Sequence, residues 1–304
     1  MTADATLVCA FAVTRSVPPR TAPLGADPGA AAGHDGGGPL RLLPAGDLWL
    51  LVQDVPAAAF DETALAERLN RPDDLERIAR AHHRAVEVAA RWGSVVPLPL
   101  ATLYLTEDTA VRAVVRREAE LAVLLGRLRG RTEWAVKVHA AGTGATAGSH
   151  SGGDSGGVGG RAYLSRVSAR RRSRDEERER ALAEARDLDR ELRRHAVAAT
   201  RHRPQSEQLT GTDAPQLLNG AYLVDDAERA SFLAAVERLA ALGRRCGTVE
   251  VVASGPWIPY SFARLDEAWQ YGDRHREQVQ DEDQDQEQEQ ERERTQAQKQ
   301  EVGA

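Results

Sequence analysis

Residues 40–55 read LRLLPAGDLWLLVQDV, two apolar runs separated by Pro44, Ala45 and Gly46. Short apolar runs on either side of a Pro/Gly turn are typical of a β-hairpin. A further strand-like run, TLVCAFAV, precedes them at residues 6–13. The first part of the chain is therefore predicted to form a sheet around this hairpin.

Helical periodicity follows the hairpin. Residues 61–69 predict a short helix, and Pro72 opens a longer one with acids in its first turn, where the helix dipole favours them. Its apolar stripe consists of Leu75, Ile78, His82, Ala85, Val86, Ala89 and Trp92. Thr106 is a suitable N-cap for one further helix, which is predicted to run to residue 128.

Two more extended segments complete this half. Residues 95–104 carry prolines at 97 and 99, so a strand there must lie at a sheet edge or be irregular. Residues 134–140, WAVKVHA, alternate as a strand does. We expect residues 1–140 to form an N-terminal α/β domain, a modified ferredoxin-like sheet with helices on one face.

The second half predicts a smaller α-β-α-β domain at residues 161–265. Its segments are a long Arg/Glu helix to about residue 199, a strand at 216–224, a helix from a capping-box-like Asp225 and Glu228 to Gly243, and a strand at 248–253. The strand precedes a rigid turn, SGPWIPYSF, at residues 254–262. The fold class is thus α+β, with two α/β domains.

Low-complexity segments separate or follow these domains. Pro and Gly at 18–39 predict a flexible loop, and Gly and Ser at 141–160 predict a linker. Residues 273–304 hold eleven acids and five bases, which accounts for the whole net charge of −6. This Gln/Glu-rich tail lacks an apolar stripe, so we expect disorder or a loose charged helix.

Composition argues against several classes of protein. No apolar run approaches the ~18 residues of a membrane helix, and no basic segment precedes the first apolar run as in a signal peptide. The two cysteines, Cys9 and Cys246, have neither disulfide-scaffold nor zinc spacing, which favours a reducing cytoplasm. We expect no metal and no cofactor.

One motif suggests an enzyme. Gly142, Gly144 and Ala147 fit a dinucleotide-binding pattern after a predicted strand, so a nucleotide-binding enzyme using residues 142–148 is an alternative. The pattern requires a helix to begin there, but the Gly/Ser run continues to Gly160, which favours a linker. His82 and His83 lack a HEXXH context and are interpreted as packing or solvated residues.

A second alternative is nucleic-acid binding by the Arg-rich helix. Its basic cluster consists of Arg170, Arg171, Arg172 and Arg174. Acids follow at once from Asp175 to Glu179, and Tyr163 is the one aromatic residue nearby. A solvated helix with internal ion pairs explains this pattern better than a stacking surface for bases.

Aromatic residues are dense only near the end of the second domain. Trp257, Tyr260 and Phe262 alternate with Pro256 and Pro259. They predict either a lid that packs Trp257 and Tyr260 onto their own domain, which we favour, or a rigid contact surface for a partner.

Three of these segments, taken in order, carry a resemblance. They are GRAYL at 160–164, LNGAYLV at 218–224 and GPWIPYSF at 255–262. Together with VVPLPLATLY at 95–104 and WAVKV at 134–138, the chain resembles the GvpL/GvpF family of gas vesicle proteins from about Leu7 to Phe262. Many relatives have Arg-Phe-Gly where this chain has Pro99, Leu100 and Ala101.

The resemblance implies a non-enzymatic role in the cytoplasm. Such proteins are accessory or minor structural components of gas vesicles, which are gas-filled protein shells. The implied partners are the small, hydrophobic major shell protein and other gas vesicle accessory proteins, with no nucleic acid and no membrane. The implied family-motif and interaction residues are Tyr163, Leu164, Asn219, Tyr222, Pro256, Trp257, Pro259 and Tyr260.

Overall fold

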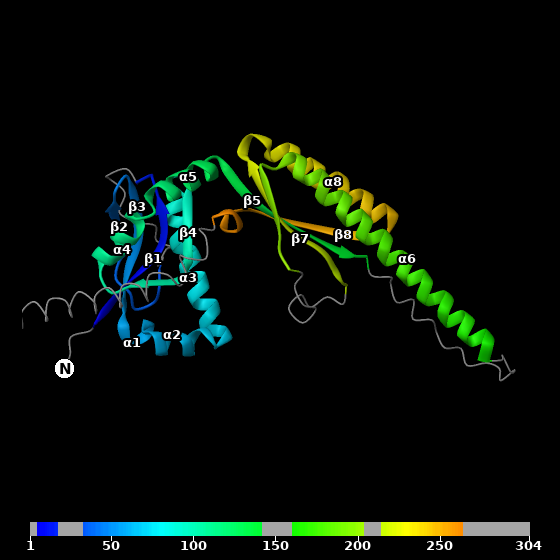
Figure 1. The fold of residues 1–304 in the computed structure, drawn as a ribbon, viewed down its shortest axis with the longest axis horizontal. Coiled ribbons are helices and arrows are strands. Elements are labelled where there is room, and N and C mark those ends of the chain that lie inside the picture. Colours follow the sequence, from blue (N-terminus) through cyan, green and yellow to red (C-terminus); the bar gives the residue numbers. More distant parts are fainter. Residues whose placement is uncertain (1–4, 18–32, 142–159, 204–213, 264–304) are drawn as a thin grey trace, which may run out of the picture. The chain divides into compact units, whose positions relative to one another are not determined.

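The computed structural model describes residues 5–17, 33–141, 160–203 and 214–263, with the side chains of 160–166 and 170 left undescribed. The described residues form two compact units, one up to Arg127 and one from Leu128 to Phe262. Each is built on a four-stranded antiparallel sheet with helices, which confirms the predicted α+β class with two α/β domains (Figure 1). The predicted linker at 142–159 and the tail at 273–304 lie outside the described residues.

The N-terminal unit has its strands in the order β2-β3-β1-β4. Its elements are β1 (Thr6–Thr14), β2 (Arg41–Ala45), β3 (Leu48–Pro56), α1 (Ala57–Phe60), α2 (Glu62–Leu69), α3 (Pro72–Ala90), β4 (Val95–Tyr104), α4 (Glu107–Val115) and α5 (Glu118–Leu128). Both β1 and β2 pair antiparallel with β3, so they run parallel to each other. This is the ferredoxin-like strand order with no helix described between β1 and β2.

Strand β4 is an edge strand and irregular, as its prolines predict. Its register with β1 jumps between Thr102, opposite Ala10, and Pro97, opposite Ala12. Within this bulge Ala101 has φ 62°, a left-handed conformation that glycine adopts without strain. Alanine at this position is therefore strained, whereas glycine would not be.

Different elements cover the two faces of this sheet, whereas the sequence predicts helices on one face. Arg41 binds Asp54 on one face and reaches Glu107 at the start of α4, at 2.6 Å. Gln53 faces the opposite way, because neighbouring strand residues alternate. There its amide accepts from the His34 N–H at 2.7 Å and donates to Gly38 O at 2.8 Å.

The prediction of a flexible loop at 18–39 is therefore wrong for residues 33–39, which pack on β3. His34 is buried, and a Cβ at Gly33 or Gly37 would stand 2.7 or 2.5 Å from the Gln53 side chain. The glycines bring the backbone close to a buried amide. Residues 18–32 lie outside the described part of the chain.

Two histidines belong to the N-terminal core. The Phe11 ring lies 5.3 Å from His34 and 5.4 Å from His82, centre to centre. Burial lowers the pKa of each imidazole to about 4, so both are neutral at pH 7. His82 thus has the packing role predicted for it, while Leu75 of the same predicted stripe is exposed.

The single helix predicted after Thr106 is two helices. Thr106 does cap α4, accepting from the Thr109 N–H at 3.2 Å, but the helix ends at Val115 and α5 begins at Glu118. The turn between them lets Val114 and Leu121 both reach the core and leaves Val115 exposed. It also lets Glu118 accept from the Asp47 N–H at 2.7 Å.

The C-terminal unit follows a β-α-β-β-α-β plan, the full ferredoxin-like topology, with sheet order β6-β7-β5-β8. Its elements are β5 (Arg131–Ala140), α6 (Gly160–Leu192), η1 (Arg193–His195), β6 (Ala198–Arg201), β7 (Gln216–Asp225), η2 (Asp226–Glu228), α8 (Arg229–Cys246), β8 (Val249–Trp257) and η3 (Tyr260–Phe262). Strand β5 is central here, so the units divide after Arg127 and not at the predicted residue 140.

Three predicted boundaries in this unit are wrong. The Arg/Glu helix ends at Leu192, because residues 198–201 pair with β7 instead of continuing the helix. Helix α8 continues to Cys246 and ends at Gly247, whose φ is 66°, a left-handed cap. Asp225 does not cap that helix; its carboxylate binds Arg131 at 2.7 Å.

The C-terminal core lies between the sheet and the two long helices. Alternate residues of β5 and β7 pack against α6 and α8, as the period of a strand dictates. The core comprises Trp134, Val136, Val138, Leu218, Tyr222, Val224, Val249, Ala181, Ala185, Leu188, Leu192, Phe232, Ala235 and Val236. Within the residues described, no helix is long and apolar enough to span a membrane.

Candidate functional site

The aromatic motif SGPWIPYSF begins as a strand and not as a turn. Residues 254–257 extend β8 along β5, where Ser254 pairs with Ala135 and Trp257 pairs with Glu133. Gly255, at φ 149°, allows this close approach, because a Cβ there would stand 2.9 Å from the Trp134 ring. The motif is thus the end of an edge strand fixed on the core tryptophan.

The far end of the motif is held by polar contacts. The Ser261 hydroxyl donates to one Glu133 oxygen at 2.6 Å, and the Ser261 N–H donates to the other at 2.9 Å. His202 Nε2 lies 3.1 Å from the same hydroxyl. Pro259 and Phe262 are buried beside this anchor. Glu133 precedes the strand predicted at residues 134–140, so the sequence pattern gives no signal for this anchor.

These three residues do not form a hydrolytic triad. In such a triad histidine stands between serine and the acid, and takes the serine proton. Here the Ser261 hydroxyl stands in the middle and donates to Glu133. The arrangement fixes η3 against β5 and has no activated nucleophile.

Trp257 is an exposed aromatic residue of the motif. Its side chain is 47% exposed, and its Nε1 donates to Ser254 Oγ at 3.3 Å. Val252, also on β8, is 49% exposed, whereas Tyr260 is half-buried and Pro256 exposed. The favoured prediction that Trp257 packs inward as a lid is therefore wrong. Strict alternation would place Trp257 on the core side with Val251 and Ala253, but the register with β5 shifts between Ser254 and Trp257. Trp257 therefore lies opposite Glu133, on the face away from the core residue Trp134.

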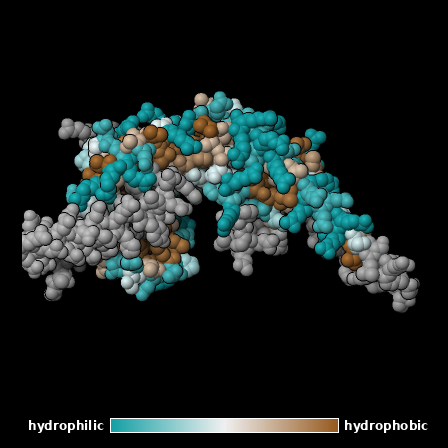
Figure 2. Space-filling view, viewed as in Figure 1, coloured by the Kyte–Doolittle hydropathy of each residue, from teal (hydrophilic) through white to brown (hydrophobic). Residues whose placement is uncertain are grey.

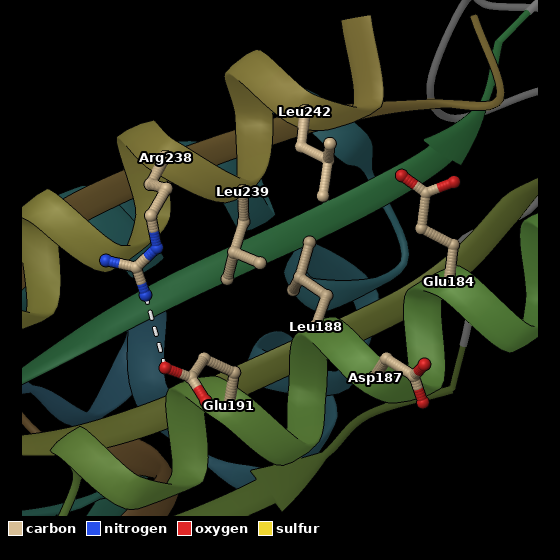
Figure 3. A pocket seen from close by; sticks show the side chains of 7 residues that line it. All are labelled: Glu184, Asp187, Leu188, Glu191, Arg238, Leu239 and Leu242. Atoms are coloured by element: carbon tan, nitrogen blue, oxygen red, sulfur yellow. Dashed lines mark hydrogen bonds and ion pairs between the residues drawn. The ribbon is translucent and has the colours of Figure 1, made fainter. Parts of the chain in front are cut away.

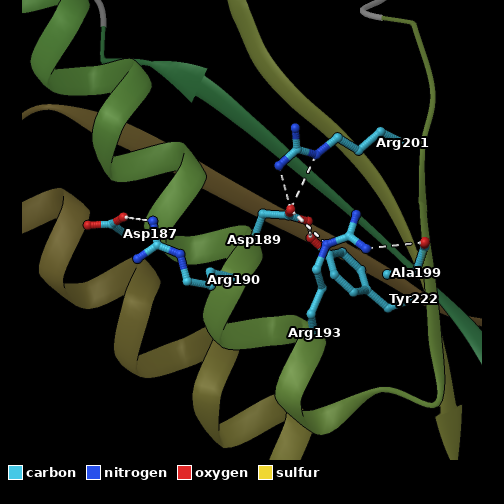
Figure 4. Close-up of polar contacts among 7 residues, drawn as sticks. All are labelled: Asp187, Asp189, Arg190, Arg193, Ala199, Arg201 and Tyr222. Carbon is cyan, nitrogen blue, oxygen red and sulfur yellow. Dashed lines mark hydrogen bonds and ion pairs between the residues drawn. The ribbon is translucent and has the colours of Figure 1, made fainter.

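Tyr222, another predicted site residue, is structural. Its side chain is fully buried, and its hydroxyl donates to Asp189 Oδ1 at 2.6 Å (Figure 4). Arg193 and Arg201 donate to Asp189 Oδ2 at 2.9 and 2.6 Å. Burial raises the pKa of Asp189, but these three hydrogen bonds outweigh it and leave the pKa below its usual value.

The remaining predicted residues are scattered. The Asn219 side chain donates to Arg203 O at 3.2 Å, where the chain leaves β6. Tyr163 and Leu164 lie in the first turns of α6, and their side chains lie outside the description. The structure therefore brings together only the residues of the C-terminal motif, with Trp257 facing outward.

Nothing in the described residues supports the two alternative functions, nucleotide binding and nucleic-acid binding. Residues 142–148, the nucleotide alternative, lie outside the described residues. Arg171, Arg172 and Arg174 are exposed on α6 and are followed by equally exposed acids up to Glu179. Across the described ranges no group of three or more His, Cys, Asp or Glu side chains is placed to hold a metal ion.

Comparison with known proteins gives consistent results. The family model "Gas vesicle synthesis protein GvpL/GvpF" matches residues 8–264. Gas vesicle protein L of Streptomyces sp. (strain CB03234) is 40% identical over 234 residues, covering 76% of this chain and 86% of that protein.

Two solved structures share the fold. GvpF from Anabaena sp. PCC7120 aligns with a TM-score of 0.59 at 17% identity, covering 86% of this chain and 98% of that one. GvpF from Microcystis aeruginosa aligns with a TM-score of 0.55 at 15% identity, covering 85% and 99%.

Proposed function

The chain belongs to the GvpL/GvpF family of gas vesicle synthesis proteins, and from that premise we propose that it is a non-enzymatic assembly protein. It binds the small hydrophobic shell protein and assists nucleation or growth of the vesicle. It acts in the cytoplasm, together with other gas vesicle proteins. The family match, which spans both structural units, carries this proposal.

The exposed end of β8 supports the binding role. Trp257 and Val252 offer apolar surface on an edge strand, whose free backbone groups suit a partner strand. Aromatic side chains held by their surroundings lose little conformational entropy on binding. Trp257 is held in this way, because Gly255 lets the strand lie against Trp134 and the Ser261–Glu133 hydrogen bonds fix the residues that follow.

The charge distribution supports the same role. A protein that holds an apolar subunit must itself stay soluble, and a net charge away from zero favours solubility. This chain has a net charge of −6, all of it accounted for by residues 273–304. The acidic tail would keep the complex soluble without altering the neutral folded part.

A deletion and complementation experiment tests the function. Cells that lack the gene should form few or no gas vesicles, counted by electron microscopy, and the wild-type gene should restore them. Trp257→Ala should fail to restore them although the variant accumulates normally. Normal vesicles in the deletion strain would refute the assembly role.

A further inference from the structure

A groove runs between the two helices of the C-terminal unit, on the side away from their sheet. It has a volume of about 480 Å³ and lies between α6 and α8 (Figure 3). Its lining consists of Glu184, Asp187, Leu188, Glu191, Arg238, Leu239 and Leu242. This surface is separate from Trp257 and β8, which lie in the sheet.

The floor of the groove is apolar. Leu188 from α6 is buried, Leu239 from α8 packs partly on the core, and Leu242 is 49% exposed. In Figure 3 these leucines lie between the helices, side by side. In the space-filling view, hydrophobic atoms show among the hydrophilic side chains of this unit (Figure 2). The floor is therefore an extension of the core that reaches solvent.

The rim of the groove is acidic on one side. Helix α6 contributes three carboxylates, from Glu184, Asp187 and Glu191, at a spacing that keeps them on one helix face. Helix α8 contributes one cation, Arg238, which is held by Glu191 at 3.2 Å. The Asp187 carboxylate is 69% exposed beside Arg190. The charged lining residues thus carry a net charge of −2, three acids against one base.

We propose that this groove binds an amphipathic helix of a partner protein, with lysine or arginine flanking its apolar stripe. A helix presents apolar anchors at i, i+3, i+4 and i+7, which suits a floor of one leucine from α6 and two leucines from successive turns of α8. Basic flanks match the acidic rim of α6. The proposal does not depend on which protein supplies the helix, so it can hold even where the proposed function fails.

Peptide binding to the full chain tests the proposal. The probe is a fluorescent 18-residue helical peptide with leucines at i, i+3, i+4 and i+7 and lysines flanking them, and its control has glutamate in place of each lysine. The lysine peptide should bind with a Kd in the micromolar range and the glutamate peptide should not. Leu242→Glu should weaken binding by at least about tenfold.

Matched variants separate the groove from general charge attraction. Val197→Glu changes a similarly exposed side chain, 47%, outside the groove lining and should leave binding unchanged. Asp187→Lys should weaken the lysine peptide, whereas Glu176→Lys, which is exposed on α6 outside the groove lining, should have little effect. Equal losses for groove and control variants, or no binding by wild type, would overturn the proposal.

Discussion

Replacing Tyr222 by phenylalanine removes one hydroxyl from a buried polar cluster. In the wild type the Tyr222 hydroxyl donates to Asp189 Oδ1, while Arg193 and Arg201 donate to Oδ2. A hydrogen bond to a charged group contributes about 1.5–3 kcal/mol. Since Asp189 is 2% exposed, water does not replace the lost donor, and we expect the free energy of unfolding to fall by about 2 kcal/mol.

The assay is guanidinium unfolding of the wild type and the variant, followed by circular dichroism. Asp187→Asn is the control, because that neighbouring carboxylate is 69% exposed and should contribute less than about 0.5 kcal/mol. Equal losses for Tyr222→Phe and Asp187→Asn would refute the reasoning.

The pH dependence gives an independent check of the same cluster. The pKa of Asp189 is lowered in the folded state, so its stabilisation is present above its unfolded pKa of about 3.9 and is lost as pH falls through the folded value. The difference between wild type and Tyr222→Phe should therefore be largest at neutral pH and shrink in acid. A difference that does not change with pH would contradict an ionised Asp189.

Trp257→Ala should lower the free energy of unfolding by no more than about 1 kcal/mol, far below the cost at a buried site, because the indole is 47% exposed; chemical denaturation checks this. Ala101→Gly should be neutral or stabilise by up to about 1 kcal/mol, whereas Ala101→Val should destabilise, because φ is 62°. Gly255→Ala should lower the melting temperature, since a Cβ would stand 2.9 Å from Trp134. Acidification from pH 6.5 to pH 4 should lower the stability of the N-terminal unit. In this range the imidazoles of the unfolded chain take up protons, whereas the buried imidazoles of His34 and His82 stay neutral until about pH 4. Hydrogen exchange of the β1 amides at each pH measures the loss.

The sequence predicts most of the strands and helices, because their periodicity is local. It cannot assign a strand to a sheet: the alternation at residues 134–140 predicts β5 but not its pairing with β7 and β8. Helix ends decided by tertiary contacts were also missed, as where residues 198–201 pair with β7.

The candidate site was predicted in part. The aromatic motif was identified, yet its proline and aromatic spacing does not reveal which side chain faces solvent. That depends on the register of Trp257 with Glu133, which the sequence does not contain. Asp189 looks like one more acid of a solvated helix, and only the fold brings Tyr222 and Arg201 to it.

Direct binding of the small shell protein to this chain tests the central claim. The shell protein would be co-expressed with the tagged wild-type chain, with Trp257→Ala, or with Val123→Ala as a control at an exposed side chain of the N-terminal unit, and the amount retained after tag purification would be measured. The wild type and Val123→Ala should retain the shell protein, and Trp257→Ala should retain much less although it remains folded. Absence of the shell protein from the purified wild-type chain would contradict the account.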